Sequence, residues 1–131
     1  MSAAAIATWL DAQTTSLTAG TNLRVGRLPE SPDLAAAIFD YTGTQPDFTM
    51  GSTWIDWPQY ELVVRGPRNG YAEAHTLMDL IRGLLNDAPA GNYSGLTVLR
   101  IELVDTPASL PPDANDRPIL STRFTAAIQR S

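Results

Sequence analysis

One stretch constrains the fold of this chain more than any other. It is a short apolar strand followed directly by a long helix with one apolar face. Residues 60–65 read YELVVR, which is typical of a strand, and a Gly-Pro pair ends it. Over 70–86 the apolar residues recur at helical spacing and form one stripe: Tyr71, Ala74, Leu77, Met78, Ile81, Leu84 and Leu85. Such a helix buries its stripe against another layer, so we expect a sheet beneath it.

The rest of the chain supplies a second helix and further strands. An apolar stripe predicts a helix over 2–18, with Ser2 as its N-cap and Gly20 as its terminator. Strands are expected over 23–28, 33–41, 97–104 and 119–129, with a long breaker-rich loop over 105–118. The order is α-β-β-β-α-β-β. We therefore expect one α+β domain over residues 1–131, a mixed or antiparallel sheet packed by two amphipathic helices.

Composition removes most classes of catalytic site. The chain has no cysteine and a single histidine, His75, which excludes thiol nucleophiles, iron–sulfur clusters and structural zinc sites. His75 lies four residues before Asp79, half of a general-base arrangement, but no serine lies in a strand–turn–helix elbow. Asp113, Asn115 and Asp116 resemble a fragment of a calcium loop that lacks its glycine and its terminal glutamate. We expect no enzymatic activity, no cofactor and no bound metal.

Charge and hydropathy narrow the class of partner. The net charge of −5 is opposite to that of a protein that grips nucleic acid by its phosphates. No apolar run approaches the roughly 18 residues of a membrane span. The N-terminal stretch has no basic region and is interrupted at Asp11, so no signal peptide is expected. All nine basic residues are arginine, which suits interface ion pairs, although an arginine-favouring genome explains the same bias.

Residues 42–58 combine chain-breaking residues with large apolar ones. Two glycines and two prolines interrupt this stretch, so it is not expected to be a regular element throughout. Large apolar groups in such a segment either fold over the sheet or contact a neighbouring molecule, and aromatic residues and methionine are enriched at interfaces. The candidate subunit-interface residues are Phe48, Met50, Trp54, Ile55 and Trp57.

Taken in order, these segments resemble the small tail terminator proteins of long-tailed phages, often classed as minor capsid proteins. The resemblance covers nearly the whole chain, through IFDYTGTQPD at 38–47, YELVVRGPRNGYAEAHTLMDLIRGLLN at 60–86 and RPILSTRFTAAIQR at 117–130. The second segment, a strand followed by Arg-Gly and a helix with a doubled leucine, carries most of the likeness. The family usually has a Gly-Arg-like turn before the last strand, where this chain has Asn115, Asp116 and Arg117.

The resemblance implies a structural role in the virion. Such proteins form a ring, usually a homo-hexamer, on the head-proximal end of the tail tube, where they stop tube polymerisation and offer a joining surface to the head. The implied partners are the tail tube protein, head-completion or connector proteins, and genomic DNA that passes without specific binding; no membrane is implied. The implied location is the tail–neck junction of the virion, after assembly in the host cytoplasm. The alternative function is a head–tail connector or head-completion protein of the phage neck.

An acidic ring would let DNA slide without sticking, because basic linings hold phosphates by counterion release. The 105–117 loop is polar, long and free of core residues, so Asp105, Asp113 and Asp116 are the candidates for a channel lining. The same loop could instead face outward or meet a neighbouring ring.

Overall fold

The computed structural model describes residues 2–48 and 53–130. Within them the chain forms two helices and seven strands, in the order α1 (Ser2–Gln13), β1 (Leu23–Val25), β2 (Ala35–Phe48), β3 (Trp54–Arg65), α2 (Tyr71–Asn86), β4 (Gly91–Tyr93), β5 (Leu96–Leu103), β6 (Ala108–Leu110) and β7 (Ile119–Arg130). The predicted α+β class and the predicted order of elements are confirmed. The sequence did not predict β4 and β6, which are each three residues long.

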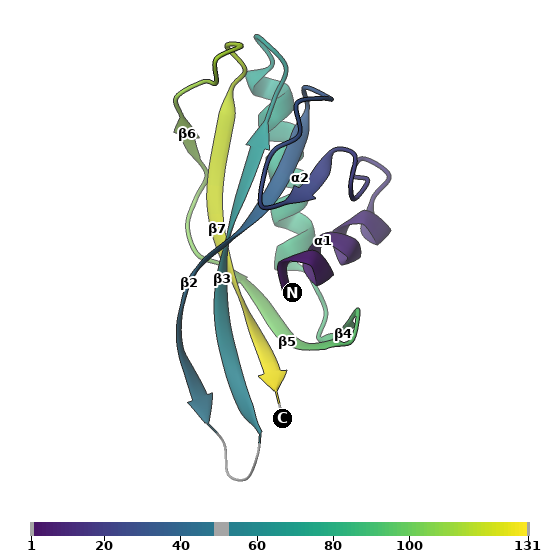
Figure 1. Ribbon diagram of the computed structural model, residues 1–131, viewed down its shortest axis with the longest axis vertical. Coiled ribbons are helices and arrows are strands. Elements are labelled where there is room, and N and C mark those ends of the chain that lie inside the picture. Colours follow the sequence, from purple (N-terminus) through teal and green to yellow (C-terminus); the bar gives the residue numbers. More distant parts are fainter. Residues whose placement is uncertain (1, 49–52, 131) are drawn as a thin grey trace.

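The strands form one mixed sheet in the order β1-β2-β3-β7-β5-β4, and β6 pairs with β7 beside this path. Only the β1–β2 pair is parallel among the described pairs. The last strand, β7, therefore lies in the middle of the sheet. Figure 1 shows the strong twist of the sheet and the lower halves of β2 and β3 reaching beyond both helices.

The core lies between the helices and one face of the sheet. Tyr60 of β3 and Phe124 of β7 are fully buried there, with their ring centroids 5.0 Å apart. Alternation over 119–129 predicts one buried face. This face is confirmed, since all five of its residues are buried: Leu120, Thr122, Phe124, Ala126 and Ile128. The stripe of α2 is confirmed in Ala74, Leu77, Met78, Ile81 and Leu85, whereas Tyr71 is half exposed.

The first helix is shorter than predicted. It ends at Gln13, because the hydroxyl of Thr14 accepts a hydrogen bond from the backbone N–H of Ser16 (3.2 Å) in place of a helical turn. Leu17 is still buried, so the apolar pattern continues after the helix has ended. The strand predicted over 23–28 covers only Leu23–Val25, because Gly26 turns the chain with a φ of +85°.

The sequence predicted no strand within 42–58, but most of the described residues of this stretch belong to β2 and β3, which pair as a long antiparallel hairpin. Two register shifts in β2, between Tyr41 and Thr44 and between Thr44 and Asp47, absorb the glycine and the proline there. Pro58 lies in β3 without breaking the register with β7, and its carbonyl accepts a hydrogen bond from the Thr125 hydroxyl (2.8 Å). We call residues 41–48 and 54–59 the arm.

Alternation over 97–104 predicts that Leu99, Ile101 and Leu103 share one face of the strand, which is partly wrong. A register shift between Val98 and Arg100 turns the strand, so that Val98 and Ile101 point inward and Leu99 is exposed. Strict alternation from a single strand cannot reveal such a bulge.

Candidate functional site

The arm presents two faces that carry different residues. The β3–β7 register is continuous from Trp54 to Arg65, so side chains alternate strictly along β3. Trp54 therefore lies on the same face as the core residue Tyr60, while Ile55 and Trp57 lie on the opposite face. The candidate interface residues of β3 are thus divided between two faces of the sheet. Phe48 ends β2 opposite Trp54, and Met50 lies outside the described residues.

On the helix-side face of the arm, an acidic residue joins two strands. The indole N–H of Trp54 donates to Asp56 Oδ1 (3.2 Å), and Arg130 Nε of β7 donates to Asp56 Oδ2 (3.0 Å). Trp54 remains half-buried. The contacts hold the Trp54 ring at the start of β3, beside the end of β7.

On the opposite face, which we call the outer face, two arginines lie over aromatic rings. The Arg100 guanidinium is 5.5 Å from the ring centroid of Trp57, and that of Arg123 is 5.3 Å from Tyr41. Arg100 also binds Glu102 (2.7 Å), and Tyr41 is 49% exposed. Arginine and aromatic side chains in this arrangement are typical of protein interfaces, because each offers apolar area together with hydrogen-bond donors.

Asp105, one of the candidate channel residues, is bound to β7. Its carboxylate accepts hydrogen bonds from the Thr122 hydroxyl and from the backbone N–H and Nε of Arg123, all at 2.9 Å. Burial alone would raise the pKa of Asp105, but the hydrogen bonds from Arg123 and Thr122 outweigh it and lower the pKa below its usual value. Asp105 therefore ties the β5–β6 connection to the sheet.

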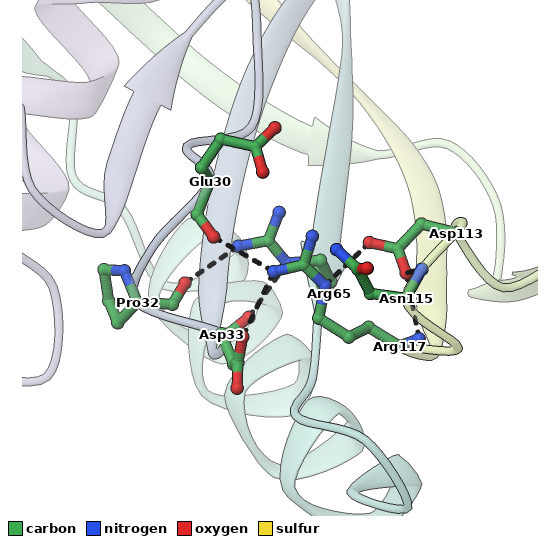
Figure 2. A network of polar contacts seen from close by, with 7 residues as sticks. All are labelled: Glu30, Pro32, Asp33, Arg65, Asp113, Asn115 and Arg117. Atoms are coloured by element: carbon green, nitrogen blue, oxygen red, sulfur yellow. Dashed lines mark hydrogen bonds and ion pairs between the residues drawn. The ribbon is translucent and has the colours of Figure 1, made fainter.

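Asp113 belongs to a buried arginine cluster that joins three distant segments (Figure 2). Arg117, 7% exposed, donates from Nε to Asp113 Oδ2 (2.7 Å) and from Nη1 to the carbonyl of Glu30 (3.0 Å) and to Asp33 Oδ1 (3.1 Å). Arg65, 3% exposed, donates to the carbonyls of Asp33 (3.0 Å) and of Pro32 (2.8 Å). The cluster pins the 30–33 turn and the 113–117 turn to the end of β3.

Of the three candidate channel residues, Asp116 alone has a largely exposed carboxylate. Its side chain is 64% exposed and lies 3.9 Å from Arg68 Nε, a long and solvated ion pair. The charges of Asp105 and Asp113 are each offset by a bound arginine. Sequence reasoning missed Arg65, Arg117 and Arg123; the all-arginine composition was the only signal, and it singled out no position.

The hydrogen bonds of Asp105 and Asp113 make the stability of the fold depend on pH in the acid range. The backbone N–H and the guanidinium of Arg117 lower the pKa of Asp113, as Arg123 does that of Asp105. A folded-state pKa below the unfolded value of about 3.9 adds stability above that value, which is lost as pH falls through the folded pKa. We therefore expect the midpoint of thermal unfolding to decrease as the pH is lowered below about 4. Asp113→Asn should lower the midpoint at pH 7 and flatten this dependence; an unchanged profile would contradict it.

The described residues offer no catalytic or metal-binding cluster. His75 packs edge-on against Tyr71, with ring centroids 4.6 Å apart. No group of three or more histidine, aspartate or glutamate side chains within 2–48 and 53–130 could hold a metal ion. In that same part of the chain, neither helix has the length and apolarity needed to cross a bilayer.

A helix-covered sheet whose long hairpin reaches beyond the helices and carries arginine–aromatic contacts is typical of a protein that assembles with others. The fold is similar to that of a chain in the virion of a native gene transfer agent particle, with a TM-score of 0.62 and 12% identity over 85% of this chain and 81% of the other. A search of curated proteins found no match. The profile of the bacteriophage tail terminator proteins matches residues 4–130, and the chain belongs to that family. It is a structural protein of the phage tail.

Proposed function

We propose that this chain caps the head-proximal end of the tail tube as a homo-hexameric ring, stops tube polymerisation and offers the joining surface for head-completion or connector proteins. It acts without catalysis, at the tail–neck junction of the virion, after assembly in the host cytoplasm. The observation that carries the proposal is the two-faced arm. A subunit in a ring meets its two neighbours through different surfaces, and an arm with unlike faces beyond the helices supplies them.

The test is tail assembly in the presence and absence of the protein, with tube lengths measured by electron microscopy. With the protein, we expect tubes of one length that join heads. Without it, tubes should run past that length and stay headless. Tubes of normal length that merely fail to join heads would contradict the cap and favour the alternative, a connector or head-completion protein of the neck.

We further propose that the 105–117 loop lines the passage for DNA, with Asp116 as its active charge and Asp105 and Asp113 as its anchors. Adding positive charge at the exposed residues Ala114 and Asn115 leaves those anchors intact. Ala114→Arg with Asn115→Arg should slow DNA ejection, and more at low salt than at high salt, because salt screens the added charge.

The matched control adds the same charge at the exposed end of α1, through Ala12→Arg with Gln13→Arg. This control should eject DNA at the wild-type rate. Salt-independent ejection by the loop variant, in particles that assemble normally, would rule the loop out as the lining.

A further inference from the structure

Two neighbouring arginines differ from the others because they have no polar partner. Within residues 2–48 and 53–130, Arg24 and Arg27 make no hydrogen bond and no ion pair, while every other described arginine has at least one polar partner. The Nε of Arg24 is buried without an acceptor, which is costly for a charged donor. Arg24 as a whole is only partly buried and Arg27 is exposed, so both guanidinium groups can bind an acceptor on another molecule.

Both arginines border a shallow groove of about 300 Å³ between α1 and β1. The Thr8 hydroxyl in this groove donates to the Ala4 carbonyl within α1 (3.0 Å), so it needs no further acceptor. A lining of small residues lets another helix approach closely. We call this surface the basic groove, and the residues of it used below are Ala4, Ala7, Thr8, Gly20, Arg24 and Arg27.

The exposed side of α2 carries the opposite charge. Glu73 and Asp79 lie three residues before and three residues after Thr76, so the two carboxylates flank this residue, about 9 Å apart along the helix axis. The Thr76 hydroxyl donates to the Ala72 carbonyl (3.0 Å), so the centre of this surface is small and has no unmet donor. We call it the acidic patch, and its five exposed residues are Ala72, Glu73, Thr76, Asp79 and Leu80.

The subunit does not use these charges internally. Neither Glu73 nor Asp79 makes a hydrogen bond or an ion pair with another described residue. The one arginine of α2, Arg82, is half-buried and donates to the Asp105 carbonyl (3.3 Å), so it does not neutralise the patch. The groove and the patch are therefore complementary in charge, and each has small residues at its centre that allow close contact.

We propose that α2 of a second copy of this chain lies in the basic groove, with Glu73 and Asp79 facing Arg24 and Arg27. Thr76 then lies over the small residues of α1, and Leu80, which is 37% exposed in the single subunit, is covered. The contact joins two different surfaces, so it can repeat around a ring. The inference rests on the proposed ring and adds a contact between neighbouring subunits beside that of the arm.

The chain has no native cysteine, so disulfide trapping can test the contact directly. One copy carries Thr8→Cys in the basic groove, and a second, mass-tagged copy carries Thr76→Cys in the acidic patch. Mixed and oxidised on tail tubes, the pair should give the tagged–untagged dimer as the main product. A tagged copy with Thr106→Cys, an exposed residue of the β5–β6 connection, is the matched control and should give little.

A single chain that carries both Thr8→Cys and Thr76→Cys tests whether the contact repeats. A ring contact should give a ladder of linked chains that ends at the number of subunits in the ring. A ladder that stops at the dimer would show a closed reciprocal pair and would contradict the inference.

Charge reversal then tests the recognition. Arg24→Glu with Arg27→Glu in the groove copy should lower the trapped yield about tenfold or more, equivalent to at least about 1.4 kcal/mol. Glu73→Arg with Asp79→Arg in the patch copy should lower it similarly against an unchanged groove, and should restore it against the reversed groove. Arg68→Glu is the matched control, because Arg68 is exposed and belongs to neither surface, and it should leave the yield unchanged.

Several results would overturn the inference. These are an equal yield with Thr106→Cys, no trapping on tubes, and a yield that charge reversal leaves intact. A yield that falls with either reversal but is not restored when the two are combined would also overturn it. Length-controlled tubes without trapping would refute this contact alone, whereas trapping with uncontrolled tubes would refute the cap alone.

Discussion

Phe124→Ala is expected to lower the free energy of unfolding by about 3–5 kcal/mol. Phe124 lies on the central strand β7, fully buried against Tyr60 and beneath the helices. Removing its ring leaves a cavity that the surrounding sheet cannot close. The total free energy of unfolding of a domain is only about 5–15 kcal/mol, so the loss is a large share of it. Denaturant unfolding followed by circular dichroism measures the change.

Phe39→Ala is the matched control, because it removes the same side chain from the outer face of β2, where Phe39 is only partly buried. Its cost should be well under half that of Phe124→Ala. Equal losses would contradict the assignment of the helix-covered face as the main core.

Trp57→Ala and Trp54→Ala should each weaken subunit association by about 2 kcal/mol, or roughly 30-fold in the dissociation constant, with little change in the unfolding midpoint. Each side chain is only partly buried on its own face of the arm, and a partner subunit would bury it further. Sedimentation over a range of concentrations measures the association, and thermal unfolding of the same samples measures the fold.

Trp9→Ala provides the contrast. Trp9 stacks on Tyr93 inside the subunit, with ring centroids 5.2 Å apart, and packs against the core. Its loss should destabilise the fold and leave the association of folded subunits unchanged. If the arm variants behave like Trp9→Ala instead, melting early while the surviving fold assembles normally, the arm tryptophans are core residues.

Local periodicity was sufficient to predict α2 and β7 and their buried faces, because each element keeps one repeat over its whole length and buries one face. It failed in the arm, where Gly43 and Pro46 are typical of loops. There the register shifts lie in β2, while the β3–β7 register continues past Pro58, and no local pattern shows which strand will lie next to which. The bulge after Val98 escaped prediction for the same reason.

The sequence predicted which types of residue form the candidate site better than it predicted how they are arranged in space. Trp54, Ile55 and Trp57 were singled out as interface residues, but only the register with β7 divides them between two faces. The bond from Arg117 to Asp33 joins residues 84 positions apart, and such a pair leaves no trace in spacing or composition. Nor could the sequence show that Arg24 lacks an acceptor for its Nε, since that depends on which acidic residues the fold brings near.

The central position of β7 also determines when the sheet of a subunit can be completed during translation. β3 and β5 flank β7 in the sheet, so neither can complete its pairing until the ribosome has synthesised residues 119–130. Until then the nascent chain carries β3 with one open edge, which is prone to pair with other chains. In the arm, β3 pairs with β7, so a chain without residues 119–130 lacks a completed arm. We therefore expect a subunit to assemble into the tail only after β7 has been synthesised.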